Sequence, residues 1–291
     1  MSLSSNLGEE KSIRLPQGMI RYRERGSGTP IVLVHGVLVN GDLWRDVVPR
    51  LADTHRCITP DLPLGSHTAP MESTADLSTP GLAALLADFM AALDLRDVTL
   101  VANDTGGAIC QLLVTSHPDR VGRLVFTSCD AFEVFPPAPF DFLLRWLPRI
   151  PGGIWLTAQG MRFAFVRRQP TGFGLLMRGE LDDELARSFT EPARASAAVR
   201  ADVARLLRGL SPAHTLAAAE RFASVRQPVL VAWGGADRLF PLELAKRLAG
   251  AFPNGRLEVV PNAHTFVPLD EPARLAALIR DFLGGRAVRS A

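Results

Sequence analysis

One carboxylate of this chain is surrounded by small residues in a pattern that could support chemistry. Asp104 follows an apolar, strand-like run (Val98–Ala102), and helical spacing begins a few residues later, at Ala108–His117. The residues two before and two after Asp104 are Ala102 and Gly106. This spacing is typical of a strained turn from a strand into a helix, where bulky neighbours would clash and the central residue is pushed into solvent. Asp104 is therefore a candidate nucleophile.

An alternative is that Asp104 only caps the helix that follows it, as aspartate often does. A cap would explain neither the small flanking residues nor the buried strand before them. A carboxylate is already ionised at neutral pH, so it can act as a nucleophile. Its attack on an sp3 carbon gives an alkyl ester that water can hydrolyse, whereas attack on a carboxylic ester would give a reactive anhydride. The residue type thus favours displacement at carbon.

Two further polar residues follow apolar runs near the end of the chain. Asp237 comes after the run Pro228–Trp233, and His264 lies between the last run, Arg256–Val260, and the last helical pattern. An imidazole can accept a proton from water, and a carboxylate beside it can fix its tautomer. A lone histidine is more often structural, so these two residues need support from the fold.

The elements that would position these residues alternate along the chain. Short apolar runs predict strands at Ser12–Leu15 and Met19–Glu24 (a hairpin), Ile31–His35, Arg56–Pro60, Val98–Ala102, Arg123–Ser128, Pro228–Trp233 and Arg256–Val260. Helical spacing predicts helices at Leu43–Ala52, Leu82–Leu93, Ala108–His117, Leu242–Phe252 and Glu271–Phe282, the last capped by Asp270. Such alternation indicates an α/β fold, with a mostly parallel sheet covered on both faces and ligands bound at the carboxyl ends of its strands.

The middle of the chain has a different character. Residues 132–210 are rich in Pro, Phe, Leu and Arg and show helical spacing without a convincing strand. We therefore expect a helical cap, or lid, at 132–210, inserted into a core made of 1–131 and 211–291. Its apolar side chains favour an apolar pocket and a small hydrophobic substrate. Trp146 and Trp155 could line that pocket and offer indole N–H groups to a leaving group.

Together these motifs resemble the α/β-hydrolase superfamily, in particular its haloalkane dehalogenase and epoxide hydrolase branch, which carries an aspartate nucleophile. The resemblance implies the α/β-hydrolase fold, with His264 as the base and Asp237 as the acid that orients it. Asp130, after the strand Arg123–Ser128, is the alternative acid, because some dehalogenases place it there. The segment His35–Leu38 matches the loop that supplies one oxyanion-hole N–H, which implies Val37, with Thr105 as the second donor. His35 itself is read as structural, shaping that loop.

The chain departs from these relatives where they bind the leaving group. Haloalkane dehalogenases normally have tryptophan after the nucleophile and often asparagine in the oxyanion loop, where this chain has Thr105 and Val37. Epoxide hydrolases use lid tyrosines, but the single tyrosine, Tyr22, lies in the N-terminal hairpin. The leading hypothesis is a hydrolase that acts through an aspartyl ester on an epoxide or an organohalide. The alternatives are an ester or lactone hydrolase or a lyase with Asp104 as base, and a non-catalytic ligand-binding relative.

The composition is that of a globular protein, with 47% hydrophobic residues and a net charge of +2. The near-neutral charge makes nucleic acid and anionic membranes poor partners, and the chain is expected to be a monomer or a homodimer. Cys57, Cys110 and Cys129 lack metal-ligand spacing and are expected to be reduced core thiols. No metal or organic cofactor is expected. The polar segment Met1–Lys11 has no apolar signal, which favours the cytoplasm.

Overall fold

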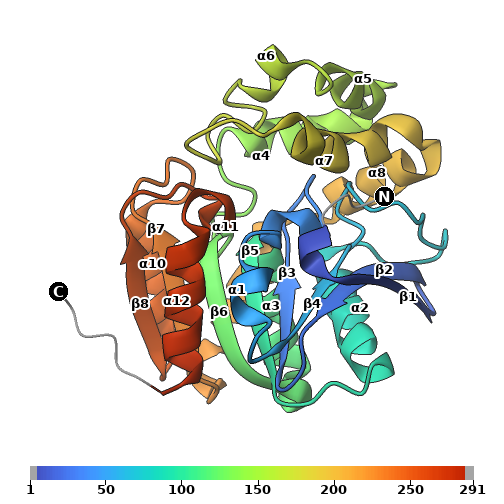
Figure 1. Ribbon diagram of the computed structural model, residues 1–291. Coiled ribbons are helices and arrows are strands. Elements are labelled where there is room, and N and C mark those ends of the chain that lie inside the picture. The colour runs from blue at the N-terminus through green and yellow to red at the C-terminus, as the bar shows by residue number, and fades with distance from the viewer. Residues whose placement is uncertain (1–4, 286–291) are drawn as a thin grey trace.

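An eight-stranded sheet forms the centre of the computed structural model, which describes residues 5–285 (Figure 1). The first four residues of the polar N-terminal segment lie outside this range. The strands are β1 (Glu9–Leu15), β2 (Gly18–Arg25), β3 (Pro30–Val34), β4 (Arg56–Pro60), β5 (Val98–Asp104), β6 (Val121–Cys129), β7 (Val229–Gly234) and β8 (Gly255–Val260). Their order in the sheet is β1-β2-β4-β3-β5-β6-β7-β8, and β3 to β8 run parallel.

The central strands are buried because helices cover both faces of the sheet. Every residue of β5 is buried, as expected of a strand with no solvent-facing side. The N-terminal strands β1 and β2 instead form the predicted antiparallel hairpin at one edge. The three cysteines are buried and free, as predicted. The predicted α/β fold with a mostly parallel sheet is confirmed.

The helices around the sheet are α1 (Val48–Leu51), α2 (Thr79–Ala92), α3 (Thr105–Ser116), α9 (Pro212–Ala219), α10 (Leu242–Ala251), α11 (Val267–Asp270) and α12 (Pro272–Leu283). They form groups that pack among themselves: α1 contacts α12, while α3 contacts α2 and α9. Figure 1 shows α1 and α12 on the near side of the sheet. The helix at α9 was not predicted from the sequence.

The predicted helix Leu43–Ala52 is wrong in its extent. The structure has a 3-10 turn at Gly41–Trp44 and then the separate short helix α1, whose second residue is Pro49. Proline has no N–H to donate, and its ring clashes with the carbonyl four residues earlier, so it disfavours one continuous helix through this position.

Residues 132–210 contain five α-helices and none of the sheet's strands. They form α4 (Phe140–Trp146), α5 (Gly153–Gly160), α6 (Ala164–Arg167), α7 (Asp183–Ala195) and α8 (Ala197–Gly209). We call this segment the helical insertion. Figure 1 shows it above the sheet, at the end where β6 leads into it. Phe173, Phe189 and Leu206 of the insertion belong to the same hydrophobic cluster as the sheet. Its role as a lid remains a prediction.

A buried polar cluster attaches α8 of the insertion to the core. Asp202 on α8 is 2% exposed, and its Oδ2 lies 3.1 Å from Nε2 of His67. The same oxygen accepts a hydrogen bond from the backbone N–H of Met71 at 2.9 Å. Arg205, one turn further along α8, donates to Asp202 Oδ1 and to backbone carbonyls of residues 72, 73 and 75. These contacts fix α8 against the loop that follows β4.

Candidate active site

Asp104 occupies the vertex of the turn between β5 and α3. Its backbone has φ 53° and ψ −132°, a conformation that non-glycine residues rarely adopt. A Cβ atom at Gly106 would lie 2.6 Å from the backbone oxygens of Val34 and His35, and one at Gly107 would lie 2.3 Å from Cβ of Cys129. These contacts explain why the residues after Asp104 must be small: α3 begins directly against β3 and β6.

The Asp104 carboxylate is buried at the C-terminal end of β5, with 9% of its surface exposed. The side chain forms no hydrogen bond that caps α3, so the reading of Asp104 as a mere helix cap is wrong. Burial raises its pKa to about 6, while hydrogen bonds from the backbone N–H groups of Thr105 and Val37 oppose the rise, and nearby Asp237 adds to it. Above that pH the carboxylate is ionised and held by two N–H donors.

Those two donors belong to the two residues that the resemblance implies for an oxyanion hole. Val37 lies in the loop after β3, and Thr105 is the first residue of α3. His35 shapes the loop as predicted: it is fully buried, its Nε2 accepts from the N–H of Leu62 at 2.9 Å, and its Nδ1 lies 2.9 Å from the carbonyl of Gly36. Burial lowers the pKa of His35 to about 4, so its ring stays neutral and holds this geometry.

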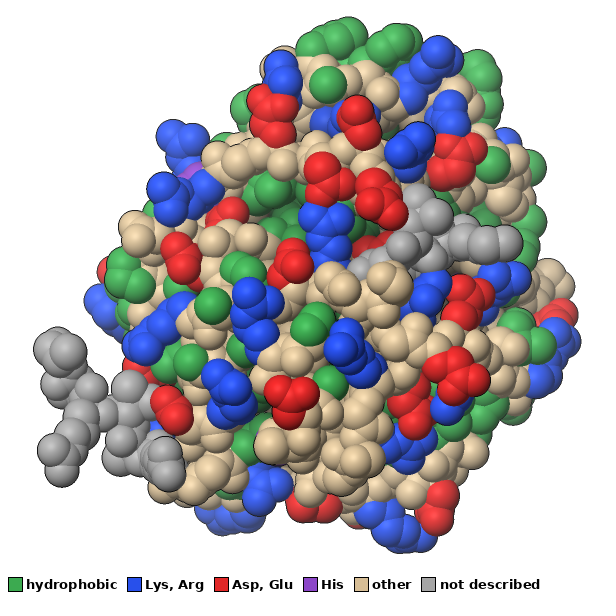
Figure 2. Space-filling view, in the orientation of Figure 1, with side chains coloured by type: hydrophobic (Ala, Val, Ile, Leu, Met, Phe, Trp, Pro, Cys, Tyr) green, Lys and Arg blue, Asp and Glu red, His purple; other side chains and the backbone are tan. Residues whose placement is uncertain are grey.

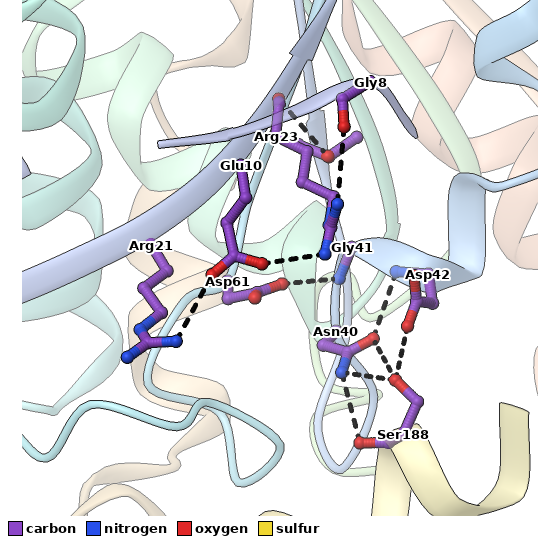
Figure 3. A network of polar contacts seen from close by, with 10 residues as sticks. Gly8, Glu10, Arg21, Arg23, Asn40, Gly41, Asp42, Asp61 and Ser188 are labelled. Atoms are coloured by element: carbon purple, nitrogen blue, oxygen red, sulfur yellow. Dashed lines mark hydrogen bonds and ion pairs between the residues drawn. The ribbon is translucent and has the colours of Figure 1, made fainter. Parts of the chain in front are cut away.

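The same loop is bonded to the helical insertion (Figure 3). The amide of Asn40 donates to the Oγ of Ser188 on α7 at 2.9 Å and to its carbonyl at 3.2 Å, and Ser188 donates to Asp42. The N–H of Gly41 donates to Asp61 Oδ1 at 2.9 Å. Because Val37 precedes this network by only three residues, the position of α7 is coupled to the loop that supplies the N–H of Val37.

His264 and Asp237 lie side by side in the loops after β8 and β7. The N–H of Ala236 donates to the carbonyl of Ala263 at 3.0 Å, and the hydroxyl of Thr265 donates to Asp237 Oδ1 at 2.9 Å. Asp237 Oδ2 and His264 Nδ1 are both buried and have no hydrogen-bond partner. The two orphaned atoms belong to the two residues that the resemblance pairs as acid and base.

Further hydrogen bonds fix the orientation of Asp237. Its Oδ1 accepts from the N–H groups of Leu239 at 2.8 Å and Phe240 at 3.0 Å. Burial raises the pKa of Asp237, and these N–H donors oppose the rise. The loop therefore holds one carboxylate oxygen and leaves the other available to a neighbour.

Asp270 does not cap the last helix, contrary to the prediction. It ends α11, and α12 begins after Glu271 without a side-chain cap. Asp270 Oδ2 instead accepts from the N–H of His264 at 2.8 Å, and its Oδ1 accepts from the N–H of Arg178 in the insertion at 3.0 Å. The carboxylate of Asp270 thus stabilises the loop that carries His264. Its position next to a predicted helix start did not indicate this role.

Asp130, the alternative acid, directly follows β6, which lies between β5 and β7 in the sheet. It is 1% exposed. Its Oδ2 accepts from the hydroxyl of Thr105 at 3.0 Å, and its Oδ1 is buried without a partner. Burial and the charge of Asp104 raise the pKa of Asp130 well above its ordinary value. Asp130 therefore contacts the residue after the nucleophile, whereas Asp237 is bonded to the residue after His264.

An apolar cavity of about 80 Å³ opens onto Asp104, Thr105 and Asp130. The rest of its wall is mostly apolar and comes from the oxyanion loop, the insertion and the loop after β7; it includes Val37, Leu38, Phe140, Leu144, Met161, Phe173, Leu176 and Leu239. A second apolar cavity of about 40 Å³ shares Val37, Leu144 and Phe173 with it. The space suits a small hydrophobic molecule with its reacting atom near Asp104.

Trp146 and Trp155 do not line this cavity, so that prediction is wrong. Their side chains are 48% and 50% exposed. Trp146 packs on the outer surface against Phe142 and under the guanidinium of Arg149. Figure 2 shows hydrophobic side chains over the outer end of the insertion, around α5 and α6. The insertion has apolar residues on both sides, so spacing alone could not tell which of them face inwards.

One residue that sequence reasoning missed connects the two halves of the site. Asn103, directly before the nucleophile, donates from Nδ2 to the carbonyl of Thr265 at 2.7 Å and to the side chain and carbonyl of Thr127 on β6. It ties the elbow to the histidine loop. Its place next to the nucleophile was the available signal, but the sequence does not show which loops its amide reaches.

Gly36 is required next to the nucleophile, and its replacement gives a testable prediction. A Cβ atom there would lie 2.1 Å from Asp104 Oδ2 and 2.6 Å from Asp104 Cβ. Gly36→Ala should therefore displace the carboxylate and lower kcat/KM roughly 100-fold or more, since small misplacements of reacting groups are costly. Thermal unfolding and steady-state kinetics would measure both effects.

The matched control is Gly250→Ala on α10, where a new Cβ meets nothing within 4 Å. That variant should keep full activity and gain slightly in stability, because alanine favours a helix. Wild-type turnover by Gly36→Ala would show that the position of Asp104 seen here is not the reactive one.

Two properties of the described residues bear on partners and cofactors. Within residues 5–285, no cluster of three or more His, Cys, Asp or Glu side chains is arranged to hold a metal ion. In the same range, none of the helices combines the length and apolar character needed to cross a membrane.

Comparison with known proteins supports the site's general nature. The alpha/beta hydrolase fold family matches residues 29–272. The chain is 28% identical over 275 residues to haloalkane dehalogenase 2 of Mycobacterium tuberculosis, covering 92% of each protein. It is also 28% identical over 272 residues to 2-hydroxymuconate semialdehyde hydrolase of a Pseudomonas species, covering 89% of this chain and 88% of that protein.

Solved structures agree on the fold. An alpha/beta hydrolase fold protein from Burkholderia ambifaria superposes with a TM-score of 0.79 at 25% identity, covering 94% of this chain and 97% of that one. An ancestral haloalkane dehalogenase superposes with a TM-score of 0.77 at 22% identity, covering 94% and 98%. The resemblance seen in the sequence is confirmed: the chain belongs to the alpha/beta hydrolase fold family and is an enzyme of the hydrolase type.

Proposed function

We propose that this enzyme hydrolyses a small hydrophobic epoxide or organohalide through a covalent ester of Asp104. One observation carries the proposal: a carboxylate, not a hydroxyl, stands at the vertex of the strained elbow, held by two backbone N–H groups at the polar end of an apolar cavity. The similarity to a haloalkane dehalogenase supports the same substrate class.

In the first step, a carboxylate oxygen of Asp104 attacks the substrate carbon from the cavity. A carbon–oxygen ester bond forms while the bond from that carbon to the halogen or epoxide oxygen breaks, and its electron pair leaves with that atom. The apolar wall excludes competing water, which leaves the carboxylate poorly solvated and reactive. The pKa of about 6 for Asp104 means that this step slows as the pH falls through that value.

In the second step, water attacks the ester carbonyl carbon of Asp104 while His264 takes its proton. The oxyanion that develops is stabilised by the N–H groups of Val37 and Thr105, which already bind the free carboxylate. Asp237 holds the proton on His264 Nδ1, so Nε2 stays free to act as the base. When the intermediate collapses, the departing alkoxide takes the proton back from His264 and leaves as the alcohol. The acid that remains on Asp104 then loses the second proton of the water to His264 and is again a carboxylate.

The experiment is to stop the reaction at the ester. His264→Gln protein is incubated with small epoxides, haloalkanes and carboxylic esters, and the peptide that contains Asp104 is analysed by mass spectrometry. We expect an alkyl adduct on Asp104, whose mass identifies the substrate class, because the variant can form the ester but lacks the base that hydrolyses it.

The double variant Asp104→Asn/His264→Gln is the matched control, and it should remain unlabelled. The proposal fails if the wild type turns over one of these compounds while His264→Gln protein exposed to the same compound carries no adduct.

A further inference from the structure

Asp130 is a second buried carboxyl group at the site, and the two steps above do not use it. It lines the cavity together with Asp104 and Thr105 and is 1% exposed. Its Oδ2 is bonded to the Thr105 hydroxyl, but its Oδ1 has no partner in the protein. A buried carboxyl oxygen without a partner is costly unless it carries a proton or binds a ligand. Its position at the cavity wall makes a ligand atom the natural partner.

The two neighbouring carboxyl groups are held in different ways. Asp104 accepts hydrogen bonds from two backbone N–H groups, which stabilise its charged form. The Asp130 carboxyl group accepts a hydrogen bond from one side chain, the hydroxyl of Thr105. Among residues 5–285 it forms no ion pair with a lysine, arginine or histidine. Two buried carboxylates this close cannot both ionise easily. The proton therefore resides on Asp130 while Asp104 carries the charge, the division of roles that separates an acid from a nucleophile.

The hydrogen-bond partners of Asp130 and Asp237 also differ. Asp237 Oδ1 accepts from Thr265, next to His264, and Asp237 Oδ2 and His264 Nδ1 are both buried without a partner. Asp130 is bonded instead to Thr105, the residue after the nucleophile, and its backbone carbonyl accepts from Gln111 on α3 at 2.8 Å. Asp130 thus lines the substrate cavity without bonding to the histidine loop. In-line attack by Asp104 drives the leaving atom away from the attacking oxygen and into this same cavity, where the free Oδ1 of Asp130 can meet it.

We propose that Asp130 is the catalytic acid that protonates the departing oxygen, and that the substrate is therefore an epoxide. This inference rests on the proposed ester mechanism. As Asp104 forms the ester bond, the epoxide C–O bond breaks, and the ring oxygen takes the released electron pair together with the proton of Asp130. Asp130 is left as a carboxylate. Hydrolysis of the ester then releases one proton, which His264 takes first and which finally returns to Asp130. The whole cycle adds one water to the epoxide and yields a diol.

An epoxide fits this arrangement better than an organohalide. An alkoxide is a poor leaving group and requires a proton, whereas a bromide leaves without one. The cavity offers an acid beside the nucleophile, and the residue after Asp104 supplies a hydroxyl that is already bonded to Asp130.

The test compares two leaving groups in the His264→Gln background, where the reaction ends at the ester. Ester formation on Asp104 is followed by quenched-flow mass spectrometry with styrene oxide and with 2-phenylethyl bromide, before and after the change Asp130→Asn. We expect the epoxide reaction to slow by about 10²- to 10⁴-fold, the usual contribution of a general acid. The bromide reaction should change by less than about 10-fold.

The pH dependence gives a second measurement that needs no change at Asp130. In the His264→Gln protein, alkylation by the epoxide should rise through the pKa of Asp104, about 6, and fall again as Asp130 loses its proton at higher pH. Alkylation by the bromide should show only the rise. The other titratable groups against Asp130 are Asp104 itself and Cys129, and burial raises the pKa of that thiol well above its ordinary value, which keeps it neutral.

The outcomes separate this inference from the proposed function. Equal slowing of both substrates by Asp130→Asn would make Asp130 a structural residue, and no slowing of the epoxide would remove it from the chemistry. In both cases the Asp104 ester would still form, and the proposed function would stand. If the wild type turns over a compound that leaves no adduct on Asp104 of His264→Gln protein, the proposed function fails, and this inference with it.

Discussion

Replacing Asp104 with asparagine is expected to abolish turnover, with a loss of roughly 10⁴- to 10⁶-fold, the range seen when members of other hydrolytic triads are removed. Asparagine keeps the shape of the side chain but is not a nucleophile towards an sp3 carbon. Steady-state kinetics on freshly purified protein would measure the loss. Asp119→Asn, which removes an exposed carboxylate far from the elbow in sequence, should leave the rate unchanged.

The same variant should be more stable than the wild type at neutral pH. Burial raises the pKa of Asp104 to about 6, so between the ordinary value near 4 and about 6 the folded protein binds more protons than the unfolded chain. Wild-type stability therefore falls as pH rises through this window, and asparagine removes that cost. Thermal unfolding should show a higher melting temperature for Asp104→Asn at pH 8 and a shrinking difference towards pH 4. A variant that is inactive because it is unfolded would show the opposite, and the loss of rate would then say nothing about the nucleophile.

The elbow could be predicted from the sequence because its requirements are local and steric. The small residues beside Asp104 are needed where α3 begins against neighbouring strands, and the apolar run before it is needed in a strand buried on both faces. Both appear directly in the sequence. The strands of the sheet could be located from equally local signals, because short β-branched runs bounded by turns are typical of buried strands.

The contacts between distant loops could not be predicted in this way. Asp270 looks like a helix cap from its spacing, but its carboxylate holds the N–H of His264, which the fold brings to it. The bond between Thr105 and Asp130 joins residues 25 positions apart, and no periodicity indicates it. Trp146 and Trp155 are large aromatic residues of the kind that line pockets, and yet they face outwards. In each case the deciding quantity is the direction of a side chain, which the packing of elements sets.

Asp237→Asn is expected to slow ester hydrolysis by about 10⁴-fold while leaving ester formation nearly unchanged. Asparagine can still accept at Oδ1 from Leu239, Phe240 and Thr265, so the loop should keep its conformation. At the other position it presents an N–H group to Nδ1 of His264. The imidazole would then hold its proton on Nε2 and could no longer accept one from water.

The variants Asp237→Asn and Asp130→Asn can be distinguished by measuring which step of the reaction each of them slows. With an epoxide that the wild type hydrolyses, Asp237→Asn should form the Asp104 ester at the normal rate and accumulate it, whereas Asp130→Asn should form it slowly and accumulate none. Asp237 is bonded to Thr265 and Asp130 to Thr105, so a single substitution at each tests a different half of the reaction. If Asp130→Asn accumulates the ester and Asp237→Asn does not, Asp130 is the acid that orients His264, and the assignment of the two carboxyl groups must be exchanged.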